Sequence, residues 1–508
     1  MATAISLPII AGALATTRLP LLIGIAMAFA VAWFVPLLSR RYHLSKIPIA
    51  ALEVGGEEQR RLVYMQKARK IYEEGYRKFK NGVFRVSGTN KSTNIVVHPR
   101  YLPELKDLPE GVLDYYTAIG ESLFTRYTKF RADRPIVPHV IKADLTPAIR
   151  RLAPLIADEV SLAFLDEFPM CKNFTEVNIS SKLYRIISKV SGHVFVGPDI
   201  CRTEKYVNIA VNYTVVRTAA QRAIAALPPW QRVFRARSLP QVKRLTLLTQ
   251  EAHDFLRPVV VARKEAARHA DYQKPDDLLQ WIIDDGQKRF GRQDTEELTS
   301  IQLALTSAAI HTTTMVATNA FYSIASMPDV VPELRAEIRE VLAEHGTFTT
   351  RALAKLKKLD SFLRENMRCN SLGWTAFPRR VKTTFTLSDG QVIPAGYNIE
   401  IPAYALSHDS SVIPDPDKFD AFRFYHAGPQ TTNDLVSVSP TNMNFGYGRH
   451  ACPGRFFAAS ELKMILSTAL LGYDIRLTDG ATERYQNMDF AGLSFPDPNK
   501  TLLFKSIA

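Results

Sequence analysis

Cysteine is scarce in this chain of 508 residues, which contains four: Cys171, Cys201, Cys369 and Cys452. They lie far apart and form no C-x-x-C pair, so their spacing excludes a disulfide scaffold and a thiolate zinc site. The sequence also lacks internal repeats, long charge blocks and any Gly/Ser-rich or Pro-rich linker after Gly56. These absences favour one large domain in a reducing compartment.

The rest of the composition is that of a globular protein. Hydrophobic residues make up 46% of the chain and charged residues 22%, which excludes a disordered or collagen-like chain. The 64 basic and 50 acidic side chains leave a net charge of +14. That balance fits nucleic acid, an anionic membrane surface or an acidic protein partner, and charge alone does not separate these three.

The longest apolar run lies near the N-terminus. Residues 19–38 contain no charged side chain, and the indole of Trp33 is their only polar side-chain group. As a helix they span about 30 Å, the hydrocarbon thickness of a bilayer. Arg40, Arg41 and Lys46 follow the run. This cationic excess predicts a single-pass anchor with the body of the protein on the cytoplasmic side.

A cleaved signal peptide is the alternative, because Ala30-Val31-Ala32 resembles a cleavage site. With an anchor, the chain divides into an N-terminal segment (1–18), a transmembrane anchor (19–38), a polar linker (39–56) and one large domain (57–508).

Periodicity predicts that this domain is mainly helical with a small sheet. Residues 60–80 have a basic amphipathic helical pattern, and helical spacing dominates again from about Leu145 to Ser371, interrupted by a loop at 228–240. The predicted strands are Val83–Ser87, Thr93–Val97, Thr383–Leu387 and Asn398–Ile401.

The strongest chemical signal is a cysteine in a glycine-rich loop. Cys452 lies within Phe-Gly-Tyr-Gly-Arg-His-Ala-Cys-Pro-Gly (445–454), directly before a helical run at Phe456–Leu470. Glycines let backbone amides approach closely, and a helix N-terminus stabilises an anion. We therefore expect the loop to lower the pKa of the sulfur and to present a thiolate to a transition metal. The alternative is a buried cysteine that acts as a small apolar side chain.

This loop resembles the haem-binding signature of the cytochrome P450 family, Phe-x-x-Gly-x-Arg/His-x-Cys-x-Gly. The matching residues are Phe445, Gly448, His450, Cys452 and Gly454. The resemblance implies that the Cys452 thiolate is the axial ligand of the iron of haem b, and that Phe445 belongs to the cofactor site. It also implies that His450, or its neighbour Arg449, contacts a haem propionate.

A second motif, Glu365-Asn-Met-Arg368, falls on a helix predicted at 359–370. Three-residue spacing puts its carboxylate and guanidinium on one face. On most helices such a pair is solvated and contributes only a few tenths of a kcal/mol, roughly. In the family the pair closes a buried network with a later arginine, and Arg423 stands in that place, although Ala421 replaces the usual proline. The resemblance thus implies that Glu365, Arg368 and Arg423 support the haem loop.

A third motif places small side chains and a threonine on one helix. Ala308 and Ala309 leave room above a flat cofactor, although such a stripe is more often ordinary core. The segment Ala-Ala-Ile-His-Thr-Thr (308–313) is similar to the distal motif of the family, Ala/Gly-Gly-x-Asp/Glu-Thr-Thr. The resemblance implies that Thr312 passes protons to bound oxygen. His311 replaces the usual acid and is expected to serve the same relay, unless it faces solvent.

Further positions follow from the resemblance. Arg380 matches a propionate-binding arginine, with Arg379 as the alternative. The expected pocket walls are Phe124, Ala308, Trp374–Phe377 and Leu493–Phe495. The loop at 228–240, which carries Trp230 and Phe234, either dips into the bilayer or packs as an ordinary interhelical loop.

Together the resemblance implies a haem-thiolate monooxygenase of the endoplasmic reticulum membrane that hydroxylates an apolar small molecule. It would use O₂ and electrons from NADPH, delivered by NADPH–cytochrome P450 reductase, and would contact membrane lipid but no nucleic acid. The motif phrases look most similar to fungal ent-kaurene oxidase-type members, which act on terpenoids and related secondary metabolites. The alternatives are rearrangement, dehydration or coupling without oxygen insertion, and haem binding without turnover.

Overall fold

The computed structural model describes residues 8–507 apart from 90–91, 132, 292, 428–432 and 479, and its description of side chains also omits 8–22 and 285–288. Residues 1–7 of the predicted N-terminal segment therefore lie outside the described residues.

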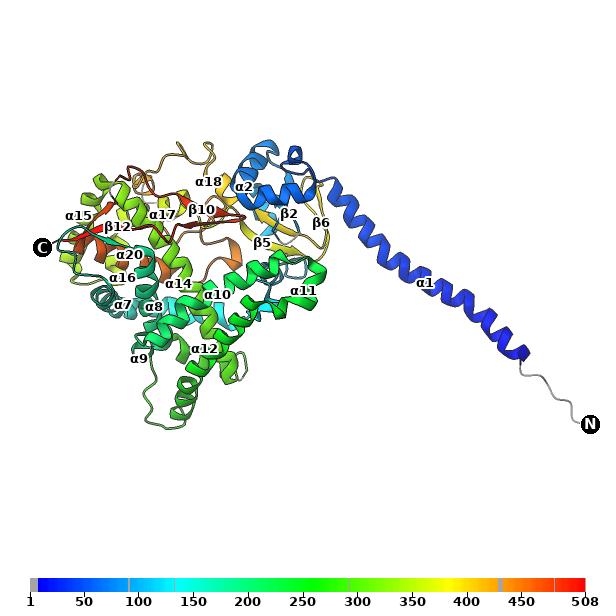
Figure 1. Cartoon of the computed structure of the whole chain (residues 1–508), viewed down its shortest axis with the longest axis horizontal. Helices are drawn as coiled ribbons and strands as arrows, with labels where there is room; N and C mark the ends of the chain where they lie inside the picture. The colour runs from blue at the N-terminus through cyan, green and yellow to red at the C-terminus, as the bar shows by residue number, and fades with distance from the viewer. Residues whose placement is uncertain are drawn as a thin grey trace, which may run out of the picture.

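The N-terminal helix, α1 (Pro8–Ser45), extends away from the body of the protein (Figure 1). It continues past the predicted end of the anchor at Leu38, because no glycine or proline stands between Pro36 and Pro48. Within the described residues it is the one helix long and apolar enough to cross a membrane, over Ile23–Ser45, with a mean hydropathy of 1.8. The most apolar stretch of 18 residues within it contains no buried residue.

The body is mainly helical around α14 (Thr295–Ser326), which is buried along most of its length. The other long helices are α2 (Glu57–Lys78), α7 (Thr146–Glu167), α8 (Ile179–Val196), α10 (Glu204–Ala226), α12 (Pro240–Ala266), α13 (Leu278–Lys288), α15 (Val331–His345), α17 (Lys357–Cys369) and α20 (Arg455–Gly472). The short helices are α3 (Leu102–Leu105), α4 (Tyr115–Ser122), α5 (Thr125–Thr128), α6 (Ile136–Val140), α9 (Pro198–Cys201), α11 (Pro229–Arg235), α16 (Thr350–Lys355), α18 (Ala403–Ser407) and α19 (Arg423–His426). Helices α8, α10, α12, α17 and α20 pack against α14, which therefore organises the main core.

A small sheet lies beside the point where α1 leaves the body (Figure 1). Its strand order is β1-β2-β8-β5-β3, with β2 parallel to β8 and the other neighbours antiparallel. The strands are β1 (Val83–Ser87), β2 (Thr93–Val97), β3 (Leu113–Asp114), β5 (Ala376–Val381) and β8 (Asn398–Ile401). The predicted hairpin and last strand are thus confirmed, with their own apolar core.

Three smaller sheets complete the β structure of the described residues. The strand predicted at 383–387 is reduced to the two residues of β6 (Phe385–Thr386), which pairs with β7 (Val392–Ile393). The remaining strands are β4 (Thr175–Val177), β9 (Tyr473–Leu477), β10 (Asn487–Phe490), β11 (Leu493–Pro496) and β12 (Leu502–Ser506).

The loop predicted at 228–240 is wrong, because this segment is largely helical. Helix α11 begins at Pro229, a 3-10 turn covers Ala236–Ser238, and α12 begins at Pro240. Proline is favoured at the first position of a helix, where its missing N–H would have had no partner. These prolines therefore start two helices, although in the sequence they read as helix breakers.

Candidate functional site

The backbone around Cys452 is fixed by two left-handed glycines. Gly446 and Gly448 have φ of 76° and 71°, a region in which a side chain would strain the backbone. The N–H of Cys452 donates to the carbonyl of Phe445 at 2.7 Å, and Nη1 of Arg455 donates to the carbonyl of Cys452 at 2.9 Å. The cysteine is thus held rigidly just before α20.

The Cys452 side chain is accessible, although protein surrounds it on most sides. Burial raises the pKa of its thiol, while the backbone N–H groups of Gly454 and Arg455 and the charge of Arg455 lower it. Desolvation prevails, so the prediction that the loop by itself lowers the pKa of this sulfur is wrong. An accessible thiol is not a packed core side chain, which excludes the apolar alternative.

The two basic residues before Cys452 share one carboxylate from a distant segment. Nε2 of His450 lies 2.7 Å from Oε1 of Glu110, and Nη2 of Arg449 lies 3.2 Å from the same oxygen. The His450 ring stacks on Tyr115, with centroids 4.5 Å apart. Burial lowers the pKa of His450, assisted by Arg379 and opposed by Glu110. Sequence reasoning missed Glu110 and Tyr115, which carry no local motif.

Strand β5 points its two arginines in opposite directions. Arg379 is only 3% exposed, with its guanidinium 3.9 Å from the Phe377 ring centroid and 5.1 Å from that of Tyr115. Arg380 lies on the other face and pairs with Glu121 at 3.2 Å. Burial lowers the pKa of Arg379 to about 10, and none of the described carboxylates pairs with it. A buried guanidinium without a carboxylate is expected to meet another anion.

Glu365, Arg368 and Arg423 form one buried network, as the motif predicts. Glu365 is fully buried, and it accepts bonds from Nε and Nη2 of Arg368 at 2.8 Å each, from Nε of Arg423 at 3.1 Å and from the N–H of Asp420 at 3.0 Å. Burial by itself raises the pKa of Glu365, but Arg368 and Arg423 hold it below its usual value. Both arginines also donate to backbone carbonyls of one loop, those of Ser407, Pro414, Pro416 and Lys418.

Helix α14 has accessible positions within its buried length. Ala308 and Thr312 are exposed and Ala309 is partly exposed, whereas Ile310 and Thr313 are buried. Oγ1 of Thr312 donates to the carbonyl of Ala308 at 2.8 Å. The small residues predicted to leave room for a flat ligand are therefore accessible, and so is Thr312, one helical turn after Ala308.

His311 lies on the other side of α14, so the solvent-facing alternative is wrong. It is 7% exposed, and Nδ1 lies 3.3 Å from the hydroxyl of Tyr184 on α8. Burial lowers its pKa to about 4, assisted by the charge of Arg217. The imidazole is therefore neutral at pH 7, and any proton relay through it uses the neutral ring.

The buried state of His311 predicts acid sensitivity. A histidine with a folded-state pKa near 4 contributes its full stability above the unfolded pKa of about 6.5 and loses it as the pH falls toward 4. Between pH 7 and pH 5 we expect the wild type to lose about 2 kcal/mol of unfolding free energy that His311→Gln does not lose. Urea unfolding at both pH values measures this difference. His426→Gln, at an exposed position, is the control and should behave as the wild type.

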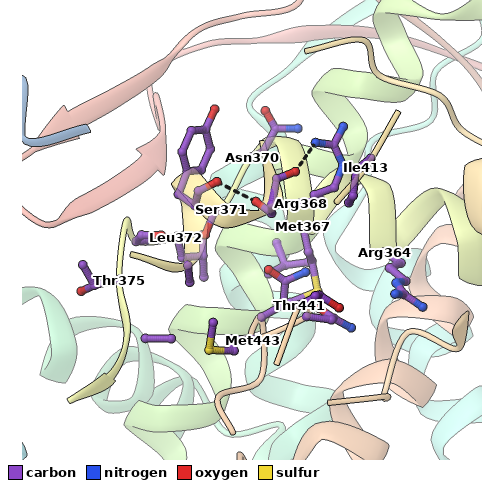
Figure 2. A pocket seen from close by; sticks show the side chains of 18 of the residues that line it. Arg364, Met367, Arg368, Asn370, Ser371, Leu372, Thr375, Ile413, Thr441 and Met443 are labelled. Atoms are coloured by element: carbon purple, nitrogen blue, oxygen red, sulfur yellow. Dashed lines mark hydrogen bonds between the residues drawn. The ribbon is translucent and has the colours of Figure 1, made fainter. Parts of the chain in front are cut away.

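The predicted pocket walls do not all line one cavity. A cavity of about 130 Å³ lies between α17, the loop that follows it and residues 441–444, with Arg364 and Thr375 at opposite ends (Figure 2). Thr375 and Ala376 line it, whereas Trp374 is buried and donates its indole N–H to the carbonyl of Ala491 at 3.0 Å. Phe124 lines a separate cleft of about 1010 Å³, and Leu493 is exposed.

Comparison with known proteins identifies the family of this chain. Residues 104–504 match the family described as Cytochrome P450. The chain belongs to the cytochrome P450 family. Three similar relatives are each named a cytochrome P450 monooxygenase. They are ATR3 of Stachybotrys chlorohalonatus (37% identical, covering 82% of this chain and 89% of the relative), paxP of Penicillium paxilli (35%, 88% and 87%) and braC of Annulohypoxylon truncatum (30%, 97% and 100%).

Family membership confirms the predicted fold class and the predicted enzyme class, an oxidoreductase with a haem-iron cofactor. Enzymes of this family use a redox partner and O₂ on apolar substrates. The residues of this cytochrome P450 fit a haem, because an accessible thiol lies in a rigid loop, Arg379 has no carboxylate among the described residues, and Ala308 and Thr312 are accessible on an otherwise buried helix.

Proposed function

We propose that this cytochrome P450 is a membrane-anchored haem-thiolate monooxygenase that hydroxylates an apolar small molecule of the terpenoid type. It takes electrons from NADPH through NADPH–cytochrome P450 reductase and inserts one atom of O₂. The observation that carries the proposal is the rigidly held, accessible thiol of Cys452 together with the buried Arg379, which has no carboxylate partner among the described residues. The similarity of its motifs to ent-kaurene oxidase-type members supports a terpenoid secondary metabolite.

Haem b, when bound, supplies the oxidation chemistry. In this proposal Sγ of Cys452, as a thiolate, would hold the haem iron. Arg379 would hold a propionate, with Arg449 and His450 as further donors for it. The carbonyl of Phe445 fixes the cysteine backbone. The hydroxyl of Thr312 would hold and pass a proton, and the neutral ring of the adjacent His311 would serve the same relay.

The two β5 arginines give opposite expectations for haem retention. In Arg379→Met the propionate loses a charged donor, so we expect haem affinity to fall by at least about tenfold. Arg380→Met removes only the exposed pair with Glu121 and should keep the wild-type haem content. The ratio of haem to protein after purification measures both. If only Arg380→Met lost haem, Arg380 would be the propionate-binding residue, as the sequence favoured.

The role of Thr312 predicts uncoupling in Thr312→Ala. Without the hydroxyl, proton delivery fails while electrons still arrive, so product formed per NADPH should fall by at least about tenfold and peroxide should accumulate. Thr318→Ala is the matched control, because Thr318 makes the same kind of bond, to the carbonyl of Thr314 at 2.8 Å, in a fully buried place. Equal coupling in the two variants would remove Thr312 from the relay.

The proposed reaction is tested by incorporation of ¹⁸O. The full chain is reconstituted with reductase, NADPH, ¹⁸O₂ and candidate terpenoid substrates. The masses of the products are measured by mass spectrometry. Hydroxylation adds one ¹⁸O atom to the substrate. A product isomeric with the substrate, dehydrated or coupled would favour the alternative reactions, and haem reduction without any product would favour haem binding without turnover.

The membrane placement rests on two apolar surfaces. Helix α1 leaves the body at the end where α11 lies (Figure 1), and α11 exposes Trp230 (70%) and Phe234 (80%). We propose that α1 spans the endoplasmic reticulum membrane, that α11 touches its cytoplasmic surface and that the net positive charge contacts lipid headgroups. Glycan attachment at Asn173, Asn178 or Asn212 would place the body in the lumen and overturn this orientation.

A further inference from the structure

Arg217 is a cation on the buried face of α10. The buried residues of this helix recur at Ala210, Tyr213, Ala220 and Ile224, and Arg217 falls in phase with them. Its guanidinium lies 4.6 Å from the ring centroid of Phe130, and its Nε is buried. A guanidinium in such a place normally has a carboxylate or carbonyl acceptor.

No acceptor for Arg217 exists among the described residues. Neither a hydrogen bond nor an ion pair joins its nitrogens to any of them, and its pKa is lowered because burial outweighs the nearby Tyr213. The contact with Phe130 covers the face of the guanidinium but leaves its N–H donors in the guanidinium plane unused. Arg134 and Arg263 differ in this respect, since Arg134 pairs with Glu297 and Arg263 pairs with Asp277.

The packing of α10 on α14 places Arg217 along the same helix that carries Thr312. The hydroxyls of Thr214 and Ser307 form a hydrogen bond with each other. The backbone carbonyls of Ala210 and Val211 lie beside the His311 ring and raise its pKa. The two helices therefore run antiparallel.

The next turn of α10, with Arg217, must then lie over the turn of α14 that contains Leu303 and Ala304. Leu303 indeed packs in one cluster with Tyr213. Ala304, Ala308 and Thr312 are the accessible positions of one α14 face, at four-residue spacing. This accessible face of α14 thus extends from Thr312 to the turn beside Arg217.

We propose that Arg217 binds a carboxylate of the substrate, so that this enzyme oxidises an apolar acid. Arg217 offers several N–H donors in one plane, the geometry that a carboxylate accepts. Eight residues of α14 separate Ala304 from Thr312, which is about 12 Å along the helix. The carboxylate therefore lies about that far from the reacting carbon, and oxidation occurs at the remote end of the substrate. This inference rests on the proposed monooxygenase function, for which it names the substrate class.

The test compares acids with their methyl esters. Dodecanoic acid and abietic acid, a linear and a rigid polycyclic acid, are each titrated beside the ester into the holoenzyme at pH 7.5, and the shift of the haem Soret band gives the dissociation constants. We expect the wild type to bind at least one acid about tenfold or more tightly than its ester. Arg217→Met should abolish this preference, and Arg217→Lys should keep part of it. Arg244→Met, which removes an exposed arginine from α12, should leave it unchanged.

Three results would overturn the inference: no acid perturbs the wild-type spectrum, acid and ester bind equally, or Arg217→Met retains the preference. Thermal unfolding gives a second measurement, in which an arginine with a purely structural role would give a different result. Removal of an unpaired charge should raise the Tm of the ligand-free Arg217→Met protein, and added acid should stabilise the wild type alone. The ferrous-CO spectrum of every variant is recorded first, and the ¹⁸O assay of the wild type accompanies it. A failure of the haem-thiolate or monooxygenase proposal appears in those two measurements and not in the acid preference.

Discussion

Cys452→Ser should remove the strongly red-shifted Soret band of the ferrous-CO protein and lower turnover by at least about a hundredfold. A serine hydroxyl is not a thiolate at neutral pH, so the iron would lose its sulfur ligand and the electron donation that favours O–O cleavage. Loss of a metal ligand is expected to exceed the 10- to 100-fold effect that is typical of the residues around it, roughly. Visible spectra of the dithionite-reduced, CO-treated proteins measure the band directly.

Cys171→Ser is the matched control for this experiment. Cys171 is fully buried, and its Sγ donates to the carbonyl of Pro169 at 3.3 Å, a bond that a serine hydroxyl can replace. We expect the control to keep the red-shifted band. A spectrum that is the same for wild type and Cys452→Ser would show that sulfur is not the ligand, and the haem-thiolate function would fall with it.

Glu365→Gln should destabilise the protein by about 3–5 kcal/mol and deplete it of haem. The substitution leaves Arg368 and Arg423 without their shared carboxylate, and an uncompensated buried charge is strongly unfavourable. Both arginines also hold the backbone of one loop, so their displacement would loosen the packing around it. Urea unfolding and the ratio of haem to protein measure the two effects.

Glu344→Gln is the control, because Glu344 forms an exposed pair with Lys355 at 2.7 Å. It should be indistinguishable from the wild type. A Glu365→Gln protein with normal stability and haem content would show that the network is not needed to support the haem loop.

The unfolding free energy at low pH depends on the same network. The pKa of Glu365 is lower in the folded state than in the unfolded chain, so its contribution is present above the unfolded pKa and is lost as the pH falls through the folded value. Glu365→Gln should therefore show a flatter dependence of unfolding free energy on pH below about pH 4. An unchanged slope would contradict the depressed pKa.

Residues that act within one turn or loop could be predicted from the sequence. The spacing of Glu365 and Arg368 fixes both side chains on one helix face, and the glycines around Cys452 fix a loop that only glycine can form. Thr312 and Ala308 follow in the same way, because one helical turn joins them. In each place the geometry is set by covalent neighbours, so the linear pattern contains it.

Residues whose role depends on packing could not be predicted. A register shift in β5 between Ala376 and Arg379, with Phe377 in the left-handed region, helps to set which of two adjacent arginines points inward. The sequence alone favoured Arg380, and the structure buries Arg379. Glu110 is 340 residues from His450 in the chain, and nothing near it indicates that contact.

By itself the sequence determined the family, the helical class and the identity of the sulfur, network and hydroxyl residues, because these depend on local spacing. Only the tertiary structure decided what surrounds them. It buries His311 in neutral form, raises the pKa of Cys452 in the protein alone, and leaves Arg217 without an acceptor among the described residues. Desolvation and charge pairing are sums over neighbours from distant segments, and those neighbours are known only once the chain has folded.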